Sequence, residues 1–295
     1  MKKVSLQTPS KAMTGIVGLD EITGGGWPRE SATLIEGGPG TGKTVLALQS
    51  LVNGARYFEE PGIFVACEEN SKRVIANAAK FGWDLMALQR KKLFFLDAQP
   101  KADLIQSGTF DLLGMLAVLT AKAEEMKAKR IVFDAVDVLL NLLNDPQAER
   151  REAYRLHEWL QARRLAAIIT CKRDAGEPIQ ARFGFLQFMV DCAVLLKHDL
   201  VQGISQRSLR VLKYRGSSFD ENESQFLIGR SGLEVADTWL VERALTPVSN
   251  KRVSSGVKRL DTVLGGGYYV SSTVLITGAP GSAKTTLCGA FAESA

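Results

Sequence analysis

Apolar residues along the chain alternate between short runs rich in β-branched and aromatic side chains and longer stretches with helical spacing. The short runs predict strands over Ser31–Glu36, Gly62–Cys67, Leu93–Leu96, Arg130–Asp134 and Ala166–Cys171. The longer stretches predict helices over Lys43–Tyr57, Ser71–Lys80, Phe110–Lys127 and Gln147–Arg164. Strands that alternate with helices predict an α/β fold, in which a mainly parallel sheet carries helices on both faces.

The pattern changes after Val190, where short apolar runs follow one another with no helical stretch between them. These runs are Val190–Lys197, Ser208–Tyr214, Ser224–Ile228 and Leu233–Val235. Strands joined by short connections usually pair antiparallel. We therefore expect this segment to form an antiparallel meander at the edge of the parallel sheet.

The chain also contains an internal repeat. Shifted by 241 residues, Gly15–Leu46 aligns with Gly256–Leu287 without a gap, and 15 of the 32 positions are identical. A repeat of this length indicates a duplicated domain. We expect a complete domain over residues 1–245, a linker over 246–255, and the truncated start of a second copy over 256–295. That start carries one strand and the beginning of one helix, and such a strand cannot bury its apolar face alone.

Composition narrows the class of protein. The chain has 295 residues, of which 45% are apolar and 23% charged, so a disordered protein is excluded. It has no apolar run long enough to span a membrane and no secretory signal. The four cysteines form no C-x-x-C pair, which disfavours a zinc site or disulfide framework and predicts a cytoplasmic protein. The net charge of +5 suits phosphorylated ligands.

A glycine-rich loop follows the first predicted strand of the complete domain. Gly37–Thr44 matches G-x-x-x-x-G-K-[ST] between a strand and a helix, the context that this motif requires. Backbone N–H groups in such a loop form an anion site at a helix N-terminus, Lys43 reaches the β- and γ-phosphates, and the Thr44 hydroxyl binds Mg²⁺. The predicted nucleotide-binding residues of the loop are Gly38, Pro39, Gly40, Thr41, Gly42, Lys43 and Thr44. A chance glycine-rich turn is the alternative.

The second copy repeats this loop with one change. In Gly278–Thr285, Ala283 stands where the pattern has its second glycine. An alanine costs little there if the position is helical, but it is strained if φ is positive. Because the rest of the second domain is absent from the chain, we expect no nucleotide turnover at this loop.

Acidic residues end two of the predicted strands. Asp134 closes an apolar strand, which is the Walker B pattern of a residue that holds Mg²⁺, and a turn aspartate is the alternative. Glu68 and Glu69 follow another strand, which we expect to lie beside the phosphate loop, where a carboxylate could orient an attacking water. A helix-capping pair before Asn70 is the alternative for these two residues.

These residues together resemble the KaiC family of the RecA-like P-loop ATPases. The resemblance is carried by Gly15–Asp20 with its triple glycine, the phosphate loop, Phe64–Glu69 with Phe81–Trp83, Asp134, Ala181–Gly184 and Leu212–Ser218. It covers nearly the whole chain and implies a RecA-like fold. It also implies homo-oligomeric rings, commonly hexamers, that bind ATP and Mg²⁺ at the clefts between subunits.

The resemblance further implies roles for individual residues. It favours Glu68 as the general base with Glu69 as its partner, and Asp134 as the Walker B acid. It implies that Lys213 and Arg215 reach the γ-phosphate of the neighbouring subunit, and it adds Ser217 to the nucleotide-binding residues. Lys213 and Arg215 are two positions apart on a predicted strand, which by itself places both cations on one face. A solvated basic edge is the alternative.

The sequence departs from the family pattern at two positions. Ala135 replaces the serine or threonine that often follows the Walker B aspartate, and Phe219 replaces a common histidine. The phosphorylatable residues of the clock members belong to the second domain, so we expect no autophosphorylation from this chain.

Several functions remain compatible with the sequence. The first is a slow, ring-forming ATPase, and the second is an assembly scaffold for a signalling partner in which hydrolysis is incidental. A DNA-acting ATPase is disfavoured, because glutamates are interleaved among the arginines of 150–164. A GTPase is disfavoured, because Cys171–Asp174 lacks the amide residue of the N-K-x-D guanine motif.

Overall fold

The computed structural model describes residues 10–99, 112–173, 182–236 and 250–294. The chain divides into two compact units, Met1–Asp237 and Thr238–Ala295. Within the described residues, no helix is both long and apolar enough to cross a membrane. All four cysteines are free; Cys67, Cys171 and Cys192 are buried and Cys288 is exposed.

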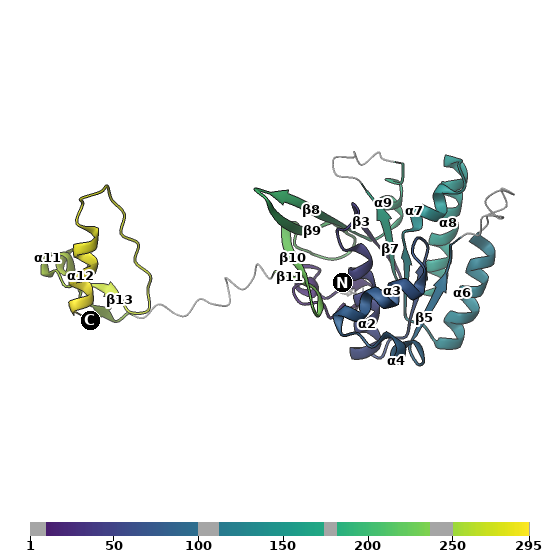
Figure 1. Cartoon of the computed structure of the whole chain (residues 1–295), viewed down its shortest axis with the longest axis horizontal. Coiled ribbons are helices and arrows are strands. Elements are labelled where there is room, and N and C mark those ends of the chain that lie inside the picture. The colour runs from purple at the N-terminus through teal and green to yellow at the C-terminus, as the bar shows by residue number, and fades with distance from the viewer. Residues whose placement is uncertain (1–9, 100–111, 174–181, 237–249, 295) are drawn as a thin grey trace, which may run out of the picture. The chain divides into compact units, whose positions relative to one another are not determined.

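The first unit is built on a sheet whose nine described strands have the order β11-β10-β9-β8-β3-β7-β6-β4-β5 (Figure 1). The strands, in chain order, are β3 (Ala32–Gly37), β4 (Gly62–Ala66), β5 (Leu93–Asp97), β6 (Arg130–Asp134), β7 (Ala166–Lys172), β8 (Cys192–Val201), β9 (Ile204–Tyr214), β10 (Glu223–Gly229) and β11 (Gly232–Val235). A separate pair, β1 (Lys11–Ala12) and β2 (Trp27–Pro28), is antiparallel. The strand that precedes the phosphate loop, β3, therefore lies at the middle of the sheet.

Parallel pairing extends further than the sequence predicts. Strands β5, β4, β6, β7 and β3 pair parallel, and β8 continues the parallel set on the other side of β3. The meander is antiparallel only from the β8–β9 pair onward. The expected antiparallel meander is thus confirmed for β8 to β11, and its first strand joins the core by pairing parallel with β3.

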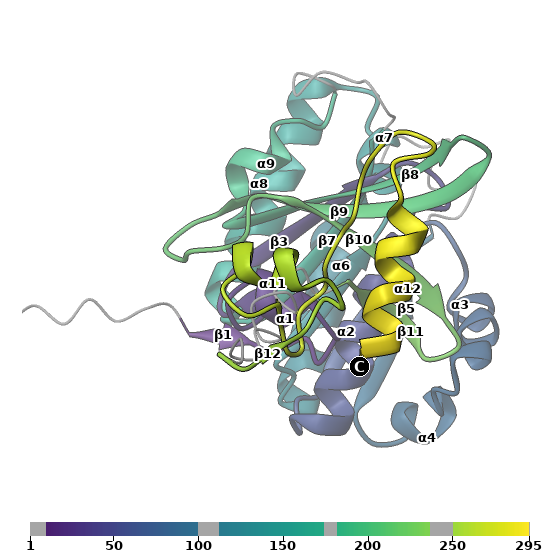
Figure 2. The same ribbon diagram turned by 90° about the vertical axis from the view of Figure 1, so that its left-hand side faces the viewer.

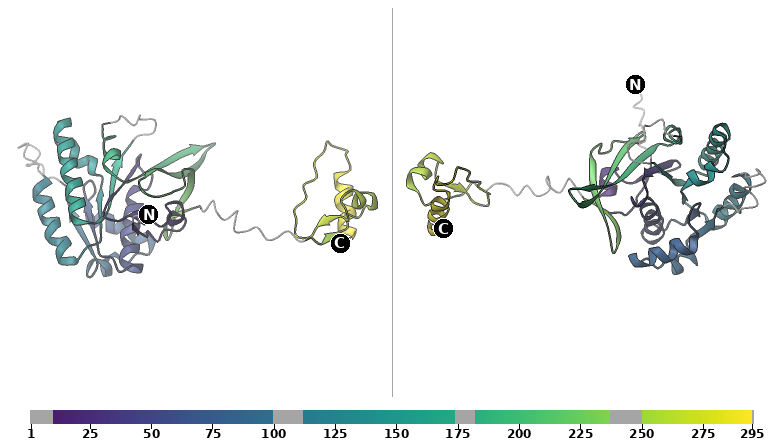
Figure 3. Two further views of the ribbon diagram at one scale, coloured as in Figure 1. Left: turned by 180° about the vertical axis from the view of Figure 1, so that it is seen from behind. Right: turned by 45° about the horizontal axis from the view of Figure 1, so that its top comes forward.

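Helices cover both faces of the sheet, as Figures 1 and 3 show from opposite sides. The long helices begin and end close to the predicted positions: α2 (Lys43–Tyr57), α3 (Ser71–Ala78), α6 (Leu112–Met126) and α8 (Pro146–Arg163). The predicted start of the α6 helix, Phe110, lies outside the described residues. The last residues of the helix predicted over Ser71–Lys80 form the separate 3-10 turn η1 (Ala79–Phe81). Short helices that the sequence pattern did not predict are α1 (Leu19–Ile22), α4 (Leu85–Gln89), α7 (Val136–Asn141) and α9 (Leu186–Met189).

Two apolar cores fill the space between the sheet and these helices. One contains Leu46 of α2 and Phe64 of β4, and the other contains Leu119 of α6, Leu160 of α8 and Phe133 of β6. Because successive strand residues point to opposite faces, the continuous apolar runs of β4, β6 and β7 supply both cores. Burial on both faces fixes the strands that carry the site residues at their carboxyl ends.

The second unit repeats the N-terminal strand pair of the first unit. Its β12 (Arg252–Val253) and β13 (Tyr268–Tyr269) pair antiparallel at positions 241 residues beyond β1 and β2. Lys11 donates to the carbonyl of Thr23 at 2.6 Å, and Arg252 donates to that of Leu264, the matching residue, at 2.7 Å. The helices α11 (Lys258–Val263) and α12 (Lys284–Ser294) complete the described part of this unit.

The strand expected in the second copy is not formed. The stretch between β13 and α12, which matches the β3 region, runs as an extended loop without ladder pairing (Figures 1 and 2). In the first unit β3 pairs with β7 and β8 on its two edges, and the described second unit contains no counterpart of either strand. A strand sequence without a neighbour has no partner for its backbone hydrogen bonds, so the apolar pattern alone does not make a strand.

Candidate functional site

The phosphate loop occupies residues 38–42, between the end of β3 and the start of α2. Gly40 and Gly42 have φ of +71° and +106°, values that turn the backbone around a common point and that glycine adopts without strain. A Cβ at Gly40 would meet nothing within 4 Å, so the loop is open on that side. Thr41 closes the loop internally by donating its hydroxyl to the carbonyl of Gly38 at 2.9 Å. This arrangement fits a phosphate group at the N-terminus of α2.

Lys43 points back into the loop rather than outward. Its Nζ donates to the carbonyl of Gly37 at 2.7 Å and to that of Gly38 at 2.9 Å, beside Pro39. Burial lowers the pKa of Lys43 below its ordinary value, and the nearby carboxylates of Asp137 and Asp134 oppose that shift. The ammonium is thus partly desolvated next to negative charge, where its attraction to an anionic phosphate is strong.

Thr44 and Asp134 meet at the first turn of α2. The Thr44 hydroxyl donates to Oδ2 of Asp134 at 2.9 Å, although the two residues are 90 positions apart in the chain. Asp134 is the last residue of β6 and is buried, and burial raises the pKa of its carboxyl while hydrogen bonds from Thr170 and Thr44 oppose the rise. A hydroxyl and a carboxylate are hard oxygen donors of the kind Mg²⁺ prefers, so both residues fit such an ion bound with a nucleotide.

The two glutamates after β4 have different surroundings. Glu68 is exposed, and its carboxylate acts electrostatically on both Lys43 and Asp134. Glu69 instead forms an ion pair with Arg73, one turn further along the chain, at 2.8 Å. The helix cap is Asn70, whose side chain accepts from the N–H of Lys72, so neither glutamate serves as the cap.

The strand order corrects one expectation about this pair. The strand that ends before Glu68 was expected beside the phosphate loop, but β7 and β6 lie between β3 and β4. Strand β4 is instead the neighbour of β6, and the N–H of Cys67 donates to the carbonyl of Asp134 at 3.1 Å. The order differs because crossover connections return β6 and β7 to the space between β3 and β4, and local sequence patterns do not encode such returns.

Lys213 and Arg215 lie together at the opposite end of β3. Lys213 Nζ donates to the carbonyls of Gln187 and Val190 at 2.8 and 2.6 Å. Arg215 pairs with Asp191 at 3.3 Å, and burial, with Arg215 nearby, lowers the pKa of Lys213. The two cations therefore share one locality, the connection between α9 and β8.

The pairing register separates these cations from the phosphate loop of their own chain. Tyr214, which lies between them, pairs with Cys192, and Cys192 pairs with Thr33 near the start of β3. Gly38 follows Thr33 by five residues, which is about 16 Å at the usual rise along a strand. The loop and the cation pair thus lie at opposite ends of the sheet.

Ser217 lies near the same end of the sheet, in the turn after β9. Its hydroxyl accepts from Nζ of Lys11 at 2.5 Å and donates to the carbonyl of Ser218 at 2.8 Å. Tyr214 donates its hydroxyl to the carbonyl of Gly26 at 2.8 Å, and Lys11 lies over its ring. The triple-glycine motif and the segment after β9 therefore hold each other in place.

Two further residues belong to the site and were not predicted. Thr170 of β7, fully buried, donates to Oδ1 of Asp134 at 2.7 Å. Asp137 of α7, also buried, accepts from the N–H of Lys172 at 3.1 Å and acts on Lys43. Both are brought to the site by the tertiary structure, and the sequence shows only that Thr170 lies near the end of a predicted strand.

The second loop resembles the first in its hydrogen bonds. Lys284 Nζ donates to the carbonyls of Gly278 and Ala279 at 2.8 and 2.9 Å, as Lys43 does in the first unit. Ala283, however, has φ of +59°, so the alanine is strained as the sequence analysis anticipated for a positive φ. Of the two outcomes left open for Ala283, the structure selects the unfavourable one.

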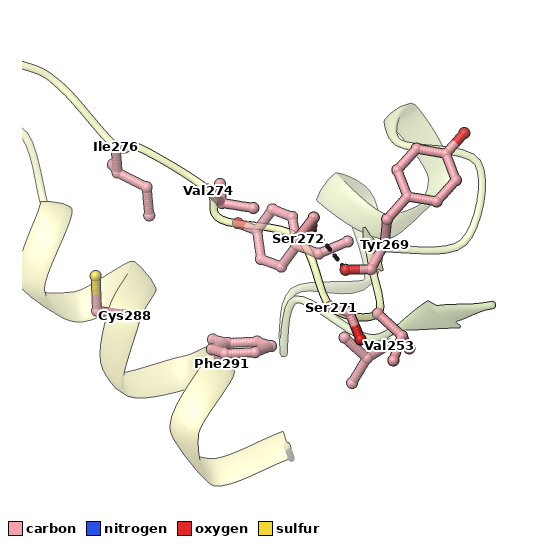
Figure 4. A pocket seen from close by; sticks show the side chains of 10 residues that line it. Val253, Tyr269, Ser271, Ser272, Val274, Ile276, Cys288 and Phe291 are labelled. Carbon is pink, nitrogen blue, oxygen red and sulfur yellow. Dashed lines mark hydrogen bonds between the residues drawn. The ribbon is translucent and has the colours of Figure 1, made fainter. Parts of the chain in front are cut away.

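A cavity of about 380 Å³ lies in the second unit (Figure 4). Val274 and Ile276 line it from the extended stretch, and Cys288 and Phe291 line it from α12. Ile35, the first-unit counterpart of Ile276, is fully buried in the sheet. The cavity therefore marks the apolar surface that the sheet covers in the first unit.

The guanine-like motif ends at Asp174, outside the described residues, while Arg173 pairs with buried Glu36 at 3.1 Å. Among the described residues, no group of three or more histidine, cysteine or acidic side chains could hold a metal ion by itself. An ion at Thr44 and Asp134 would take its remaining ligands from a nucleotide and from water.

Comparison with known proteins agrees with this geometry. A family model described as "ATPase: KaiC" matches residues 12–238 and 253–295. The chain is 40% identical over 297 aligned residues to the circadian clock oscillator protein KaiC of Prochlorococcus marinus subsp. pastoris, with 100% of this chain and 58% of the relative covered. It is 37% identical over 288 residues to the circadian clock protein KaiC2 of Synechocystis sp., with 96% and 50% covered.

The chain thus spans only 50% to 58% of the length of these relatives. The match nevertheless covers both units, and the residues of the phosphate loop, Glu68, Asp134 and the Lys213–Arg215 pair all fall inside it. The fold is an α/β RecA-like core with antiparallel strands at one edge. The chain therefore belongs to the KaiC family of ATPases.

Proposed function

We propose that the chain binds ATP with Mg²⁺ in the loop 38–44 and hydrolyses it slowly, with each nucleotide held between two subunits of a homo-oligomeric ring. Six subunits, a cytoplasmic location and a protein signalling partner complete the proposal. The clock role named for the relatives is not carried over, because the chain spans only part of their length.

The observation that carries the proposal is the separation of the phosphate loop from the cation pair. In one chain, Lys213 and Arg215 lie near the start of β3 and the loop follows its end. Along the strand, about 16 Å separate the cation pair from the loop, and no side chain spans that distance. If these cations stabilise the charge that develops on the γ-phosphate, a second chain has to supply them. This arrangement supports a nucleotide at a head-to-tail interface, which forms a ring where the rotation between subunits closes.

Within one chain, the described residues divide the remaining work. Lys43 and the N–H groups of the loop would hold the β- and γ-phosphates, and Thr44 and Asp134 would hold Mg²⁺. The ion would supply charge neutralisation of the phosphates. Glu68, exposed and close enough to act on Lys43 and Asp134, would accept a proton from the attacking water.

Substitution of the two glutamates tests whether the chain is an enzyme. We expect Glu68→Gln to lower phosphate release from Mg·ATP by about 100-fold or more, since a general base contributes that much, with ATP binding retained. Glu69→Gln is the matched control and should stay within about twofold, because Glu69 is engaged with Arg73.

The same variants separate the ATPase from the assembly scaffold. Solution mass with and without Mg·ATP would be measured beside phosphate release. Equal phosphate release from the Glu68→Gln variant and the unmodified chain would reject Glu68 as the base. Persistent assembly and partner binding by a variant that releases no phosphate would make the scaffold function the principal one.

A further inference from the structure

The buried hydroxyl of Thr170 has no role in the function proposed above. Thr170 lies on β7, between the strand that leads into the phosphate loop and the strand that ends in Asp134. It is fully buried, yet its hydroxyl is used twice: it donates to Oδ1 of Asp134 at 2.7 Å and accepts from the N–H of Ala135 at 2.7 Å. A buried hydroxyl that both donates and accepts a hydrogen bond holds a fixed orientation.

Hydrogen bonds at both oxygens define the direction of the Asp134 carboxylate. With Oδ1 held by Thr170, the other oxygen, Oδ2, faces α2 and accepts from the Thr44 hydroxyl at 2.9 Å. A continuous series of hydrogen bonds thus links Thr170 to Asp134 and Asp134 to Thr44. Asp134 and Thr44 are the two residues that fit Mg²⁺. Ligating carboxylates are commonly oriented by a second hydrogen bond of this kind.

The backbone after Asp134 gives a second reason for this bond. Ala135 has φ of +63°, a conformation that is unfavourable for alanine, and it is the N-cap residue before α7. Its N–H is directed to Thr170 and not into a helix or a ladder. The hydroxyl therefore holds both the side chain of Asp134 and the turn that follows it.

We propose that Thr170 is a positioning residue for the metal-binding pair, which fixes the Asp134 carboxylate so that Asp134 and Thr44 act together on Mg²⁺. This proposal rests on the proposed function, because it concerns the same site. It assigns Thr170 no contact with the nucleotide. Its effect should appear in the dependence of the chain on Mg²⁺ and not in its affinity for metal-free ATP.

The test replaces the hydroxyl without changing the shape of the side chain. For Thr170→Val in the full chain, we expect the Mg²⁺ concentration that gives half-maximal phosphate release at saturating ATP to rise about tenfold or more, as for other residues that orient metal ligands. ATP affinity in the presence of EDTA should be unchanged. Thr170→Ser retains the hydroxyl and should restore the Mg²⁺ dependence to within about twofold of the unmodified chain.

A matched control separates this effect from a general loss of packing. Thr33→Val makes the same change at a fully buried position of the adjacent strand β3, which pairs with β7 and makes no hydrogen bond to Asp134. It should leave the Mg²⁺ dependence as it is. If Thr170→Val does not fold, Thr170→Cys takes its place, because a thiol is a weak donor, and it should raise the Mg²⁺ requirement severalfold.

The outcomes distinguish this proposal from the one on which it rests. If Thr170→Val, or Thr170→Cys in its place, needs no more Mg²⁺ than the unmodified chain, the positioning role is wrong and the proposed function stands. If the unmodified chain binds Mg·ATP but releases no phosphate, the gain in ATP affinity on adding Mg²⁺ is the readout, and its loss in Thr170→Val supports the role. If Mg²⁺ does not strengthen ATP binding in the unmodified chain, both proposals fail.

Discussion

At the scale of single residues, burial gives the phosphate loop its electrostatic character. Lys43 is partly removed from water, and the pKa of its ammonium is lowered by that burial while Asp137, Asp134 and Glu68 counteract the change. Asp134 is removed from water as well, and the pKa of its carboxyl is raised. A bound phosphate would favour the charged form of Lys43 and a bound cation the charged form of Asp134, so the ligands would oppose both effects of burial.

The sequence identifies some of these residues and not others. Lys43, Thr44 and Asp134 are predictable, because a spaced motif and a strand-end acid specify them without reference to the fold. Thr170 and Asp137 are not, because a threonine in a strand and an aspartate in a short helix have many structural uses. Their proximity to the loop depends on β7 and α7 returning to it, which only the tertiary structure reveals.

The charge around Lys43 predicts how ATP binding depends on pH. The protonated ammonium binds phosphate, so affinity is complete below the pKa of Lys43 in the free protein and falls as pH rises through it. Since that pKa is lowered, the fall should begin at a lower pH than for an ordinary lysine. Asp137→Asn removes the carboxylate that opposes the lowering most, so the fall should move to a still lower pH.

ATP titrations at a series of pH values from neutral upward would measure this dependence. Glu69→Gln is the control, because Glu69 is paired with Arg73 and is not among the charges that act on Lys43. An alkaline fall at the same pH in Asp137→Asn as in the unmodified chain would show that Asp137 does not hold the charge of Lys43.

At the scale of elements, local pattern predicts which segments form strands but not which strands become neighbours. The strands β4, β6 and β7 form where apolar runs predict them, yet their order in space differs from their order in the chain. The stretch before Lys284 shows the converse, since it repeats the pattern of β3 and forms no strand without counterparts of β7 and β8. Strand pairing is thus a property of the sheet.

The two copies of the phosphate loop predict the effect of an alanine at its second glycine. Gly42 has φ of +106°, and a Cβ there would lie 2.8 Å from Cδ1 of Ile228, whereas Ala283 in the second loop holds φ of +59°. We expect Gly42→Ala to destabilise the first unit by about 1–2 kcal/mol, the cost of a left-handed alanine, and to weaken ATP binding severalfold.

Denaturant unfolding and ATP titration would measure both effects. Ala283→Gly is the reciprocal control: it relieves the strain in the second loop and should leave ATP binding by the first unit unchanged. Unaltered stability and affinity in Gly42→Ala would mean that the loop relaxes at no cost and that the glycine is not needed for its φ.

At the scale of the whole molecule, the proposed site is divided between two chains. In the proposed arrangement, one chain would supply the loop, Thr44, Asp134 and Glu68, and the next would supply Lys213 and Arg215 from the other end of its sheet. This division would make hydrolysis conditional on assembly, because a single chain would lack the two cations that the reaction needs beside its own loop. It also means that the loop can be inactivated by substitution in one chain and the cation pair in another.

Mixing two inactive variants tests this division directly. A Lys43→Ala chain lacks the loop lysine and retains the cation pair, and a Lys213→Ala, Arg215→Ala chain has the reverse. Each should release little phosphate alone. If the two variants are mixed in equal amounts and assemble at random, about one quarter of the interfaces combine an intact loop with intact cations. Activity should therefore return to about a quarter of the unmodified level.

The mixture also requires evidence that the two chains exchange, which solution mass with one chain enlarged by a tag provides. Activity restored only when mixed assemblies form would locate the cations on the neighbouring subunit. Mixed assemblies that stay inactive would argue that the loop and the cations have to come from one chain. Because about 16 Å of strand separates them there, that result would reject the phosphate as the target of Lys213 and Arg215.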